Sequence, residues 1–233
     1  MSKGIIIAGK CAPEERLLSY AYEAGLPAVE LYTTAETLDD METAAKICGK
    51  FPLRYALHAP NTGCDPVKLA EFTEAVGAEV VVTHDIYWED EWLEIAGLFK
   101  KINTRLCVEN TYSIHEPAKF MRRYGLGRCL DLEHLQMECA GIFEEEFVRF
   151  IKQASHIHLT GYSSGTDLWH SHIHHSPEQG RYFLDLIHRS GYSGFIVSEA
   201  RSAYQTAEEF RALNVFFGQW EKDAGESMGG VAQ

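Results

Sequence analysis

Eight short apolar runs, each typical of a β-strand, recur at intervals of about 22 to 28 residues, with one longer interval near the end. They cover residues 4–8, 28–32, 53–58, 79–84, 105–109, 128–132, 156–160 and 194–199. Helical spacing of apolar residues fills the segments between them, at 14–24, 71–76, 91–100, 117–124, 143–153, 182–189 and 208–220. No hairpin signal joins consecutive runs. Parallel pairing is therefore expected, because parallel neighbours need a crossover connection.

Eight strand–helix units predict an α/β fold, the (β/α)8 TIM barrel. The chain has 233 residues, close to the roughly 250 that such a barrel needs. An open, doubly wound sheet is the alternative, but the glycine-rich turn typical of it is missing after the first run, at residues 9–13. We expect a single domain over residues 1–224 and a flexible C-terminal tail over 225–233.

Charge and hydropathy limit the possible partners. The chain has 21 Lys and Arg against 34 Asp and Glu, a net charge of −13, which argues against a broad basic surface for nucleic acid or membrane lipid. Nucleic acid is not excluded, because bound metal ions can create a local cationic site. No apolar run approaches the roughly 18 residues of a membrane span, and no secretory signal is visible. We expect a cytoplasmic protein with six free cysteines, and its oligomeric state is left open.

Imidazoles and carboxylates follow the predicted strands, where the C-terminal strand ends of a barrel meet at one mouth. In chain order they are His58, His84, Glu109, Asp131, His134, His158 and Glu199, and the loop after the seventh strand adds His170, His172, His174 and His175. Lysine and arginine are scarce at these strand ends, so divalent metal is the expected compensation for the crowded carboxylates. Mixed imidazole and carboxylate ligands favour Zn²⁺, Mn²⁺ or Fe²⁺. We predict one to three such ions per chain.

Other residues receive weaker expectations. The first strand is expected to bring no polar side chain to the mouth, and His156 is expected to point outward to the helices. Arg181 and Arg201 follow the last ligands and are candidates for contact with a substrate phosphate, although surface ion pairs explain them equally well. Several aromatic residues follow strand ends, where they either cover a sugar ring or pack in the core: Trp88, Trp92, Tyr112, Tyr162 and Trp169.

The whole chain resembles the xylose isomerase-like TIM barrels, and its ligand pattern is similar to that of the apurinic endonuclease IV branch. The matching segments are 57–58, 83–84, 108–111, 130–134, 156–159, 172–176 and 197–199. In that branch three metal ions share nine protein ligands. By position, the resemblance implies three metal sites: one of His58, His84 and Glu109, a shared one of Glu109, Asp131, His158 and Glu199, and a third of His134, His172 and His174.

The sequence also departs from that branch. His172 stands where the branch has an aspartate, which places the third site in question. Residues 32–36 and 58–63 lack the polar side chains and the wedge with which the branch grips DNA. Base flipping needs such inserted groups, so a small substrate is favoured and an abasic-site endonuclease is only an alternative.

Two chemistries fit these residues. The favoured hypothesis is a multinuclear metallohydrolase of a small phosphorylated substrate, in which Glu109 and Glu199 bridge or orient the ions. The alternative is a single-metal sugar isomerase or epimerase, such as the tagatose epimerase and hydroxypyruvate isomerase of the same superfamily. There the two glutamates would move a proton beside a carbonyl and His134 would bind substrate. The additional histidines favour hydrolysis, and a metal-binding protein without turnover is the remaining possibility.

Overall fold

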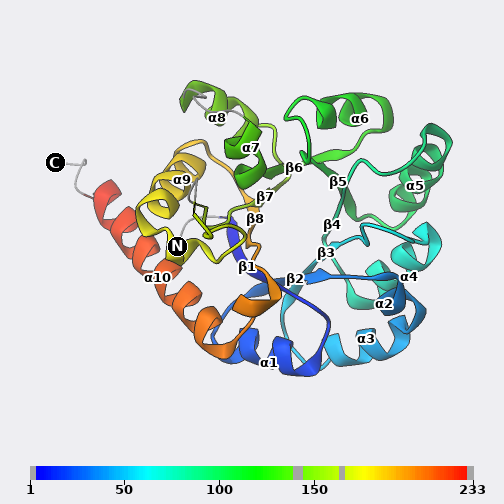
Figure 1. The fold of residues 1–233 in the computed structure, drawn as a ribbon, viewed down its shortest axis with the longest axis horizontal. Coiled ribbons are helices and arrows are strands. Elements are labelled where there is room, and N and C mark those ends of the chain that lie inside the picture. Colours follow the sequence, from blue (N-terminus) through cyan, green and yellow to red (C-terminus); the bar gives the residue numbers. More distant parts are fainter. Residues whose placement is uncertain (1–3, 139–143, 163–165, 230–233) are drawn as a thin grey trace.

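Eight parallel strands close into a barrel in chain order, and β1 pairs with β8 to complete the ring (Figure 1). The computed structural model describes residues 4–138, 144–162 and 166–229. The strands are β1 (Ile5–Cys11), β2 (Ala28–Tyr32), β3 (Arg54–His58), β4 (Val80–Thr83), β5 (Arg105–Glu109), β6 (Gly127–Asp131), β7 (His156–His158) and β8 (Gly194–Ser198). The predicted (β/α)8 barrel is confirmed.

Helices surround this barrel (Figure 1). They are α1 (Glu15–Glu23), α2 (Ala35–Asp39), α3 (Met41–Cys48), α4 (Pro66–Val76), α5 (Glu89–Lys101), α6 (Glu116–Tyr124), α7 (Leu132–Glu138), α8 (Glu144–Ile151), α9 (Pro177–Arg189) and α10 (Ala207–Gly229), with the short 3-10 helices η1 (Ile173–His175) and η2 (Ser202–Tyr204). The helical ranges expected from the sequence pattern do not include α2, α3 or α7. Each spans at most about two turns, too few for a clear apolar period.

Local signals explain where a typical helix begins and ends. The Asp65 side chain accepts hydrogen bonds from the backbone N–H groups of Val67 and Lys68, at 2.9 and 3.2 Å, and Pro66 occupies the first turn of α4. Gly77 ends the helix with φ +65°, a conformation that costs glycine little. Such caps turn the chain back toward the next strand.

The strands alternate between the barrel interior and the helical layer. Small and apolar side chains fill the interior: Ala8, Ala28, Ala56, Val80, Val82, Cys107, Cys129, Phe195 and Val197. A larger apolar cluster joins the outer strand faces to the helices. Because the side-chain period of a strand is two, the residue two positions beyond each interior residue also faces the interior. This alternation positions the candidate site.

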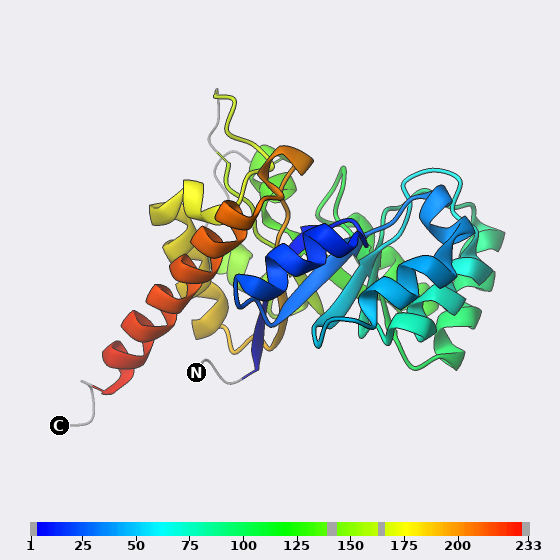
Figure 2. The same cartoon turned by 90° about the horizontal axis from the view of Figure 1, so that it is seen from below.

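The C-terminal boundary differs from the prediction. Helix α10 continues to Gly229, past the predicted start of the tail at residue 225, and residues 230–233 lie outside the described part. It packs against α1 and α9 along one side of the barrel (Figure 2).

The five cysteines that lie in described segments are free thiols, whereas Cys139 lies outside them. Over the described residues, no helix combines the length and the apolar character that crossing a membrane requires.

Candidate metal centre

Polar side chains occupy the interior positions just above the apolar ones, toward the C-terminal ends of the strands. They are Lys10, Glu30, His58, His84, Glu109, Asp131, His156, His158 and Glu199. Those outside β7 lie two positions beyond an apolar interior residue of the same strand, and on β7 His156 and His158 are two residues apart and so share one face. The barrel alternation therefore gathers residues from all eight strands at one mouth.

Glu109, Asp131, His158 and Glu199 form the central group, whose possible ligand atoms all lie within 4.8 Å of one another. His158 Nδ1 lies 2.7 Å from Glu199 Oε2, 3.5 Å from Glu109 Oε2 and 3.7 Å from Asp131 Oδ2. The short contact to Glu199 does not have hydrogen-bond geometry. Among the described residues, Asp131 Oδ2, His158 Nδ1 and Glu199 Oε2 are buried without a hydrogen-bond partner. Buried polar atoms without a partner are energetically costly, so the set fits a divalent cation.

His58, His84 and Glu109 form an adjoining group that shares Glu109 with the first. Glu109 Oε2 lies 3.3 Å from His58 Nε2 and 3.5 Å from His84 Nε2. His58 Nδ1 lies 3.0 Å from the carbonyl oxygen of Ala59, which can only accept, so Nδ1 carries a proton. When His58 is neutral, its Nε2 lone pair therefore faces the Glu109 carboxylate, an arrangement that a cation between them would stabilise.

His134 contacts Glu109 from the other side. Its Nδ1 lies 3.3 Å from Glu109 Oε1 and 3.1 Å from the Asn110 carbonyl oxygen, and its backbone N–H donates to Asp131 Oδ1 at 2.7 Å. Burial lowers the pKa of His134, but the hydrogen bond to Glu109 and the nearby carboxylates raise it more, to about 10. Burial raises the pKa of Glu109, yet the charge on His158 and the hydrogen bonds from three histidines hold it well below its usual value.

Glu30 lies beneath the central group and was missed in the sequence analysis. Its Oε2 lies 2.7 Å from His156 Nε2 and 3.2 Å from His158 Nε2, and all three side chains are fully buried. The expectation that His156 points outward is wrong, because residues two apart on a strand share a face. Burial raises the pKa of Glu30, but the His158 charge and both histidine hydrogen bonds lower it further, well below its usual value. Glu30 thus orients the ring that presents Nδ1 to the central group.

Lys10 corrects the expectation that the first strand brings no polar residue to the mouth. Strand β1 continues to Cys11, past the predicted end at residue 8, so Lys10 lies inside. Its ammonium contacts Glu199 Oε1 and lies 3.6 Å from Glu30 Oε1. Burial lowers the pKa of Lys10, but the neighbouring carboxylates raise it more. Part of the carboxylate charge is therefore compensated by the protein itself. An isolated charged residue in an apolar run was the available signal for both Lys10 and Glu30.

His172 and His174 are not brought to His134. His172 Nδ1 lies 3.0 Å from Ser198 Oγ, on the outer side of β8, and its ring lies 5.5 Å from that of Phe210 in α10. His174 contacts Glu209 of α10. No group of possible ligands in the described part of the chain joins either histidine to His134. The third site implied by the resemblance is not assembled here, because the chain after β7 passes behind the barrel wall.

Arg181 also lies away from the mouth. It belongs to α9, where its Nη1 forms an ion pair at 2.5 Å with Asp223 Oδ2 of α10. This is the surface ion pair that the sequence left as the alternative.

Arg201, in contrast, lines a cleft of about 460 Å³ together with Lys10, Tyr32, His170 and Glu199. Its guanidinium lies 4.5 Å from the ring centre of Trp169, and its Nε is buried without a hydrogen-bond partner in the described structure. His170 is held at the cleft by an ion pair of 2.8 Å with Glu133.

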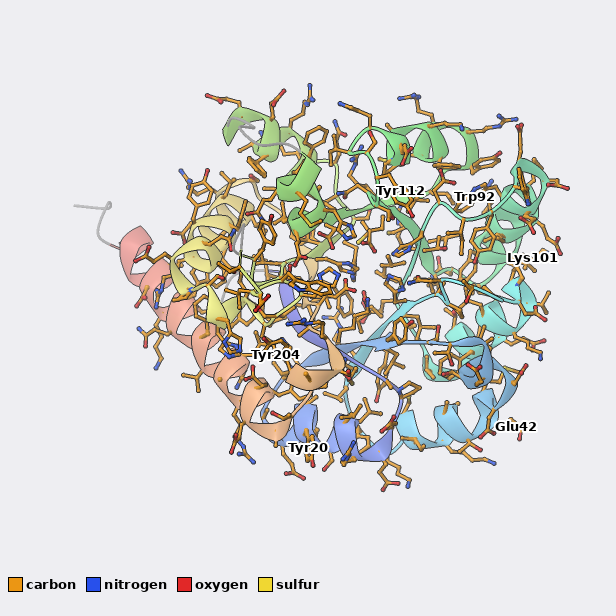
Figure 3. All side chains as sticks on the ribbon, viewed as in Figure 1. Tyr20, Glu42, Trp92, Lys101, Tyr112 and Tyr204 are labelled. Atoms are coloured by element: carbon orange, nitrogen blue, oxygen red, sulfur yellow. The ribbon has the colours of Figure 1, made fainter. Side chains whose placement is uncertain are left out.

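The candidate aromatic residues divide between core and surface. Trp92 is buried against Tyr87 and Phe120, whereas Tyr112 is 81% exposed just beyond β5 (Figure 3). Trp88 and Trp169 are exposed as well, so burial supports core packing for Trp92.

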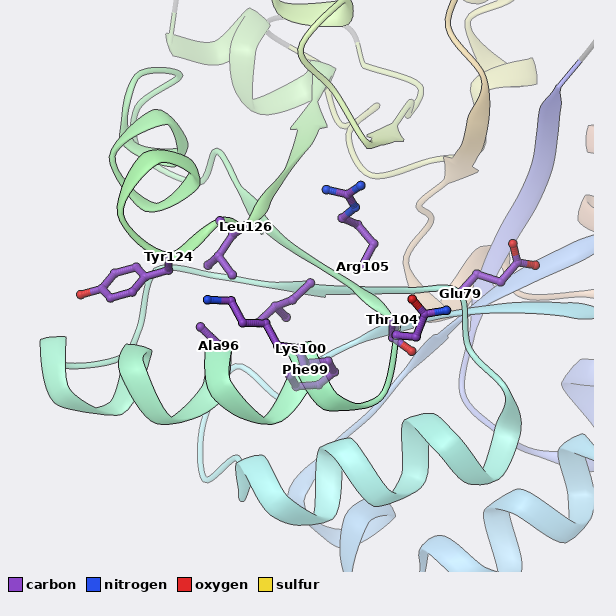
Figure 4. A pocket seen from close by; sticks show the side chains of 11 residues that line it. Glu79, Ala96, Phe99, Lys100, Thr104, Arg105, Tyr124 and Leu126 are labelled. Carbon is purple, nitrogen blue, oxygen red and sulfur yellow. The ribbon is translucent and has the colours of Figure 1, made fainter.

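A second hollow, of about 340 Å³, lies at the opposite end of the barrel, between α5, α6 and the start of β5 (Figure 4). Its charged lining residues are Glu79, Lys100 and Arg105. Within the described segments, no group of possible metal ligands includes any of its residues. Catalytic chemistry in such barrels belongs to the C-terminal end, so the candidate site is the mouth.

Comparisons with known proteins place the chain in a family. A family model described as xylose isomerase-like TIM barrel matches residues 18–228. The comparison with curated proteins gives no match. A D-allulose 3-epimerase from Methylomonas sp. is 13% identical, with a TM-score of 0.68 over 94% of this chain and 98% of that one. A Thermus thermophilus protein from a crystal soaked with ZnCl2 is 18% identical, with a TM-score of 0.61 over 93% and 98%.

A phosphoribosylanthranilate isomerase from Thermotoga maritima is also similar, at 13% identity and a TM-score of 0.53 over 91% of this chain and 97% of that one. At these identities the structural likeness shows the shared fold alone. The family model, in contrast, covers most of the sequence and agrees with the closed eight-stranded barrel. The chain belongs to the xylose isomerase-like TIM barrel family.

Proposed function

We propose that this protein is a metal-dependent isomerase or epimerase of a small, sugar-like substrate. The observation that carries the proposal is the convergence of Glu109, Asp131, His158 and Glu199, with three buried ligand atoms that have no hydrogen-bond partner among the described residues. Three carboxylates and one imidazole suit Zn²⁺, Mn²⁺ or Fe²⁺. The ion would polarise the carbonyl and neighbouring hydroxyl oxygens of the substrate.

The two glutamates are the proposed proton carriers. Glu109 and Glu199 approach the centre from β5 and from the end of β8, and both lie within 3.5 Å of His158 Nδ1. One carboxylate takes a proton from the carbon beside a carbonyl, and the other returns a proton to the substrate. Lys10 holds Glu199 in place, and the His134 ring is held against Glu109, where its remaining edge is available to a substrate hydroxyl.

The cleft beside the centre sets the substrate class. Its volume of about 460 Å³ suits a small molecule. Lys10, Arg16 and Arg201 line it together with Glu14 and Glu199, and because Lys10 pairs with Glu199, the two arginines leave one net positive charge beside Glu14. The buried Nε of Arg201 is a donor aimed at no protein acceptor among the described residues. These features favour a phosphorylated or carboxylated sugar over a neutral one.

The test combines metal analysis with a substrate screen. Purified protein should contain Zn, Mn or Fe, and it should exchange solvent deuterium into the carbon beside the carbonyl of a ketose or ketose phosphate, as followed by NMR. Less than about a tenth of an ion per chain after metal supplementation would refute the metal centre. Phosphate release from esters without any deuterium exchange would refute isomerisation.

A multinuclear metallohydrolase is the second candidate, and one observation favours it. His58 and His84 meet Glu109 beside the central group, so Glu109 is placed to bridge two ions. Paired ions suit in-line displacement at phosphorus. His84→Ala distinguishes the two candidates: the number of bound ions falls by one for a multinuclear site and is unchanged for a single-metal isomerase. A duplex containing an abasic site belongs in the same screen, and its cleavage would support the DNA alternative.

A further inference from the structure

A second cluster of possible ligands lies outside the barrel. His174 and His175 of η1 meet Glu209 of α10, and their ligand atoms lie within 4.8 Å of one another. His175 Nε2 lies 2.8 Å, and His174 Nε2 3.2 Å, from the same oxygen, Glu209 Oε2. We propose that His174, His175 and Glu209, here called the outer cluster, bind a zinc ion that joins η1 to α10. This proposal does not depend on the proposed function.

The distances suit zinc. Zinc binds imidazole nitrogen and carboxylate oxygen at about 2.0–2.2 Å in tetrahedral geometry, which places neighbouring ligand atoms about 3.3 Å apart. The distances from Glu209 Oε2 to His175 Nε2 and His174 Nε2, 2.8 and 3.2 Å, are close to that separation. Two histidines and one glutamate are an established zinc ligand set that leaves one coordination position open. Calcium and magnesium prefer sites made of oxygen ligands alone.

The ligand-bearing segments are fixed by contacts of their own. Ile173 is fully buried and its backbone N–H donates to Ser198 Oγ at 3.2 Å, which anchors η1 on the outer face of β8. The Glu209 backbone N–H donates to Thr206 Oγ1 at 3.3 Å, in the first turn of α10. Both sides of the outer cluster are therefore positioned by the fold, which lowers the ordering cost of binding an ion.

One side of the outer cluster is open to solvent and the other is covered. The His175 ring lies 5.2 Å from that of Tyr204, which Figure 3 labels beside α10. Tyr204 shields one side of the cluster, and the His175 side chain remains 32% exposed, so an ion can enter from solvent.

The outer cluster is separate from the barrel centre. Ser198, which supports η1, faces the helical layer, whereas Glu199 faces the mouth, so β8 lies between the two sites. An ion in the outer cluster would tie the end of the loop after β7 to α10. The same loop carries His170 at the substrate cleft. The expected role is therefore structural support of one wall of the cleft.

Zinc counting on the full chain tests the proposal. Metal-free protein is titrated with Zn²⁺ against a chromogenic chelator. We expect His175→Ala and Glu209→Gln each to bind one ion fewer than the wild type. Glu109→Gln should keep the outer ion, and His115→Ala, which removes a histidine outside every possible ligand group of the described residues, is the matched control.

Thermal melting supplies a second readout. Zinc should raise the melting temperature of the wild type more than that of His175→Ala. The melting temperatures of the two metal-free proteins are measured first and serve as the reference for each shift. Glu209→Gln nearly preserves the shape of the side chain, so it replaces His175→Ala in both experiments if His175→Ala does not fold. Equal zinc counts in the wild type and in both outer-cluster variants would overturn the proposal. If zinc binding at the barrel centre fails instead, Glu109→Gln and the wild type will bind equal numbers of ions while the outer-cluster variants still lose one.

Discussion

The two ends of the barrel carry similar residue types in different physical settings. At the mouth, Glu109, His158 and Glu199 lie within a few ångströms of one another, with side chains between 0 and 16% exposed. At the opposite end, Arg54 and Glu79 form an ion pair at 2.6 Å with side chains 48% and 43% exposed. Water screens the second pair and leaves it weak, whereas burial strengthens the interactions at the mouth. The comparison shows that the candidate site differs from the opposite end in burial and convergence, rather than in charge alone.

The largest expected effect separates the two ends by activity. Glu109→Gln should lower kcat/KM on the substrate identified by the screen about 10³-fold, because it removes a proton carrier and a shared ligand. Glu79→Gln, at the opposite end, should stay within about twofold of the wild type. Comparable losses in the two variants would show that the mouth is not the reactive end. Circular dichroism melting controls for unfolding.

Lys10→Met tests charge compensation at the mouth. It leaves Glu199 without its ammonium partner, so urea unfolding of metal-free protein should show a loss of about 3 kcal/mol. Zinc should then stabilise the variant more than the wild type, because a positive charge beside the ion is gone. Lys50→Met removes an ammonium that pairs with Glu15 at the surface, and it should cost less than about 1 kcal/mol. Equal effects of the two substitutions would argue against burial as the cause.

Glu30→Gln tests the support beneath the centre. The neutral amide orients His158 less firmly, so zinc affinity at the barrel centre should fall about 10- to 100-fold while the number of ions is retained. Competition with a chelator of known affinity measures the change. Glu23→Gln, on the exposed face of α1, is the control and should leave the affinity unaltered. An unchanged zinc affinity in Glu30→Gln would show that Glu30 does not orient His158 for metal binding.

The smallest effect is expected at the end opposite the mouth. Arg54→Ala should lower the free energy of unfolding by about 0.5 kcal/mol, because its partner Glu79 is exposed to water. Zinc binding should not change. A loss of several kcal/mol in urea unfolding would show that this end contributes to the fold far more than its exposure indicates.

The sequence pattern located most, but not all, of the mouth. His58, His84, Glu109, Asp131 and His158 lie together there. The first three end their predicted strands, and Asp131 and His158 lie one and two residues before the ends predicted for theirs. Lys10 was missed because β1 is longer than its apolar run. Glu30 was missed because a strand-end rule ignores residues deeper in a barrel.

The residues that were expected at the mouth but lie elsewhere were misplaced for a different reason. His172, His174 and Arg181 all follow β7, in a segment whose path over the barrel is set by packing against α10. The position of a residue in a sequence motif does not show whether its loop enters the mouth of the barrel or runs along the outer face of the strands. In this chain, buried Ile173 and the hydrogen bond to Ser198 hold that segment outside.

The sequence by itself determined the eight-unit barrel and the strands that deliver imidazoles and carboxylates, since periods of 2 and 3.6 residues are local properties of the chain. Only the tertiary structure decided which atoms share a centre, that Lys10 and Glu30 support it, and that two histidines belong to a separate cluster. These features depend on strand register, on barrel closure and on loop packing. Each of those is a sum of contacts between residues far apart in the chain, which no local pattern encodes.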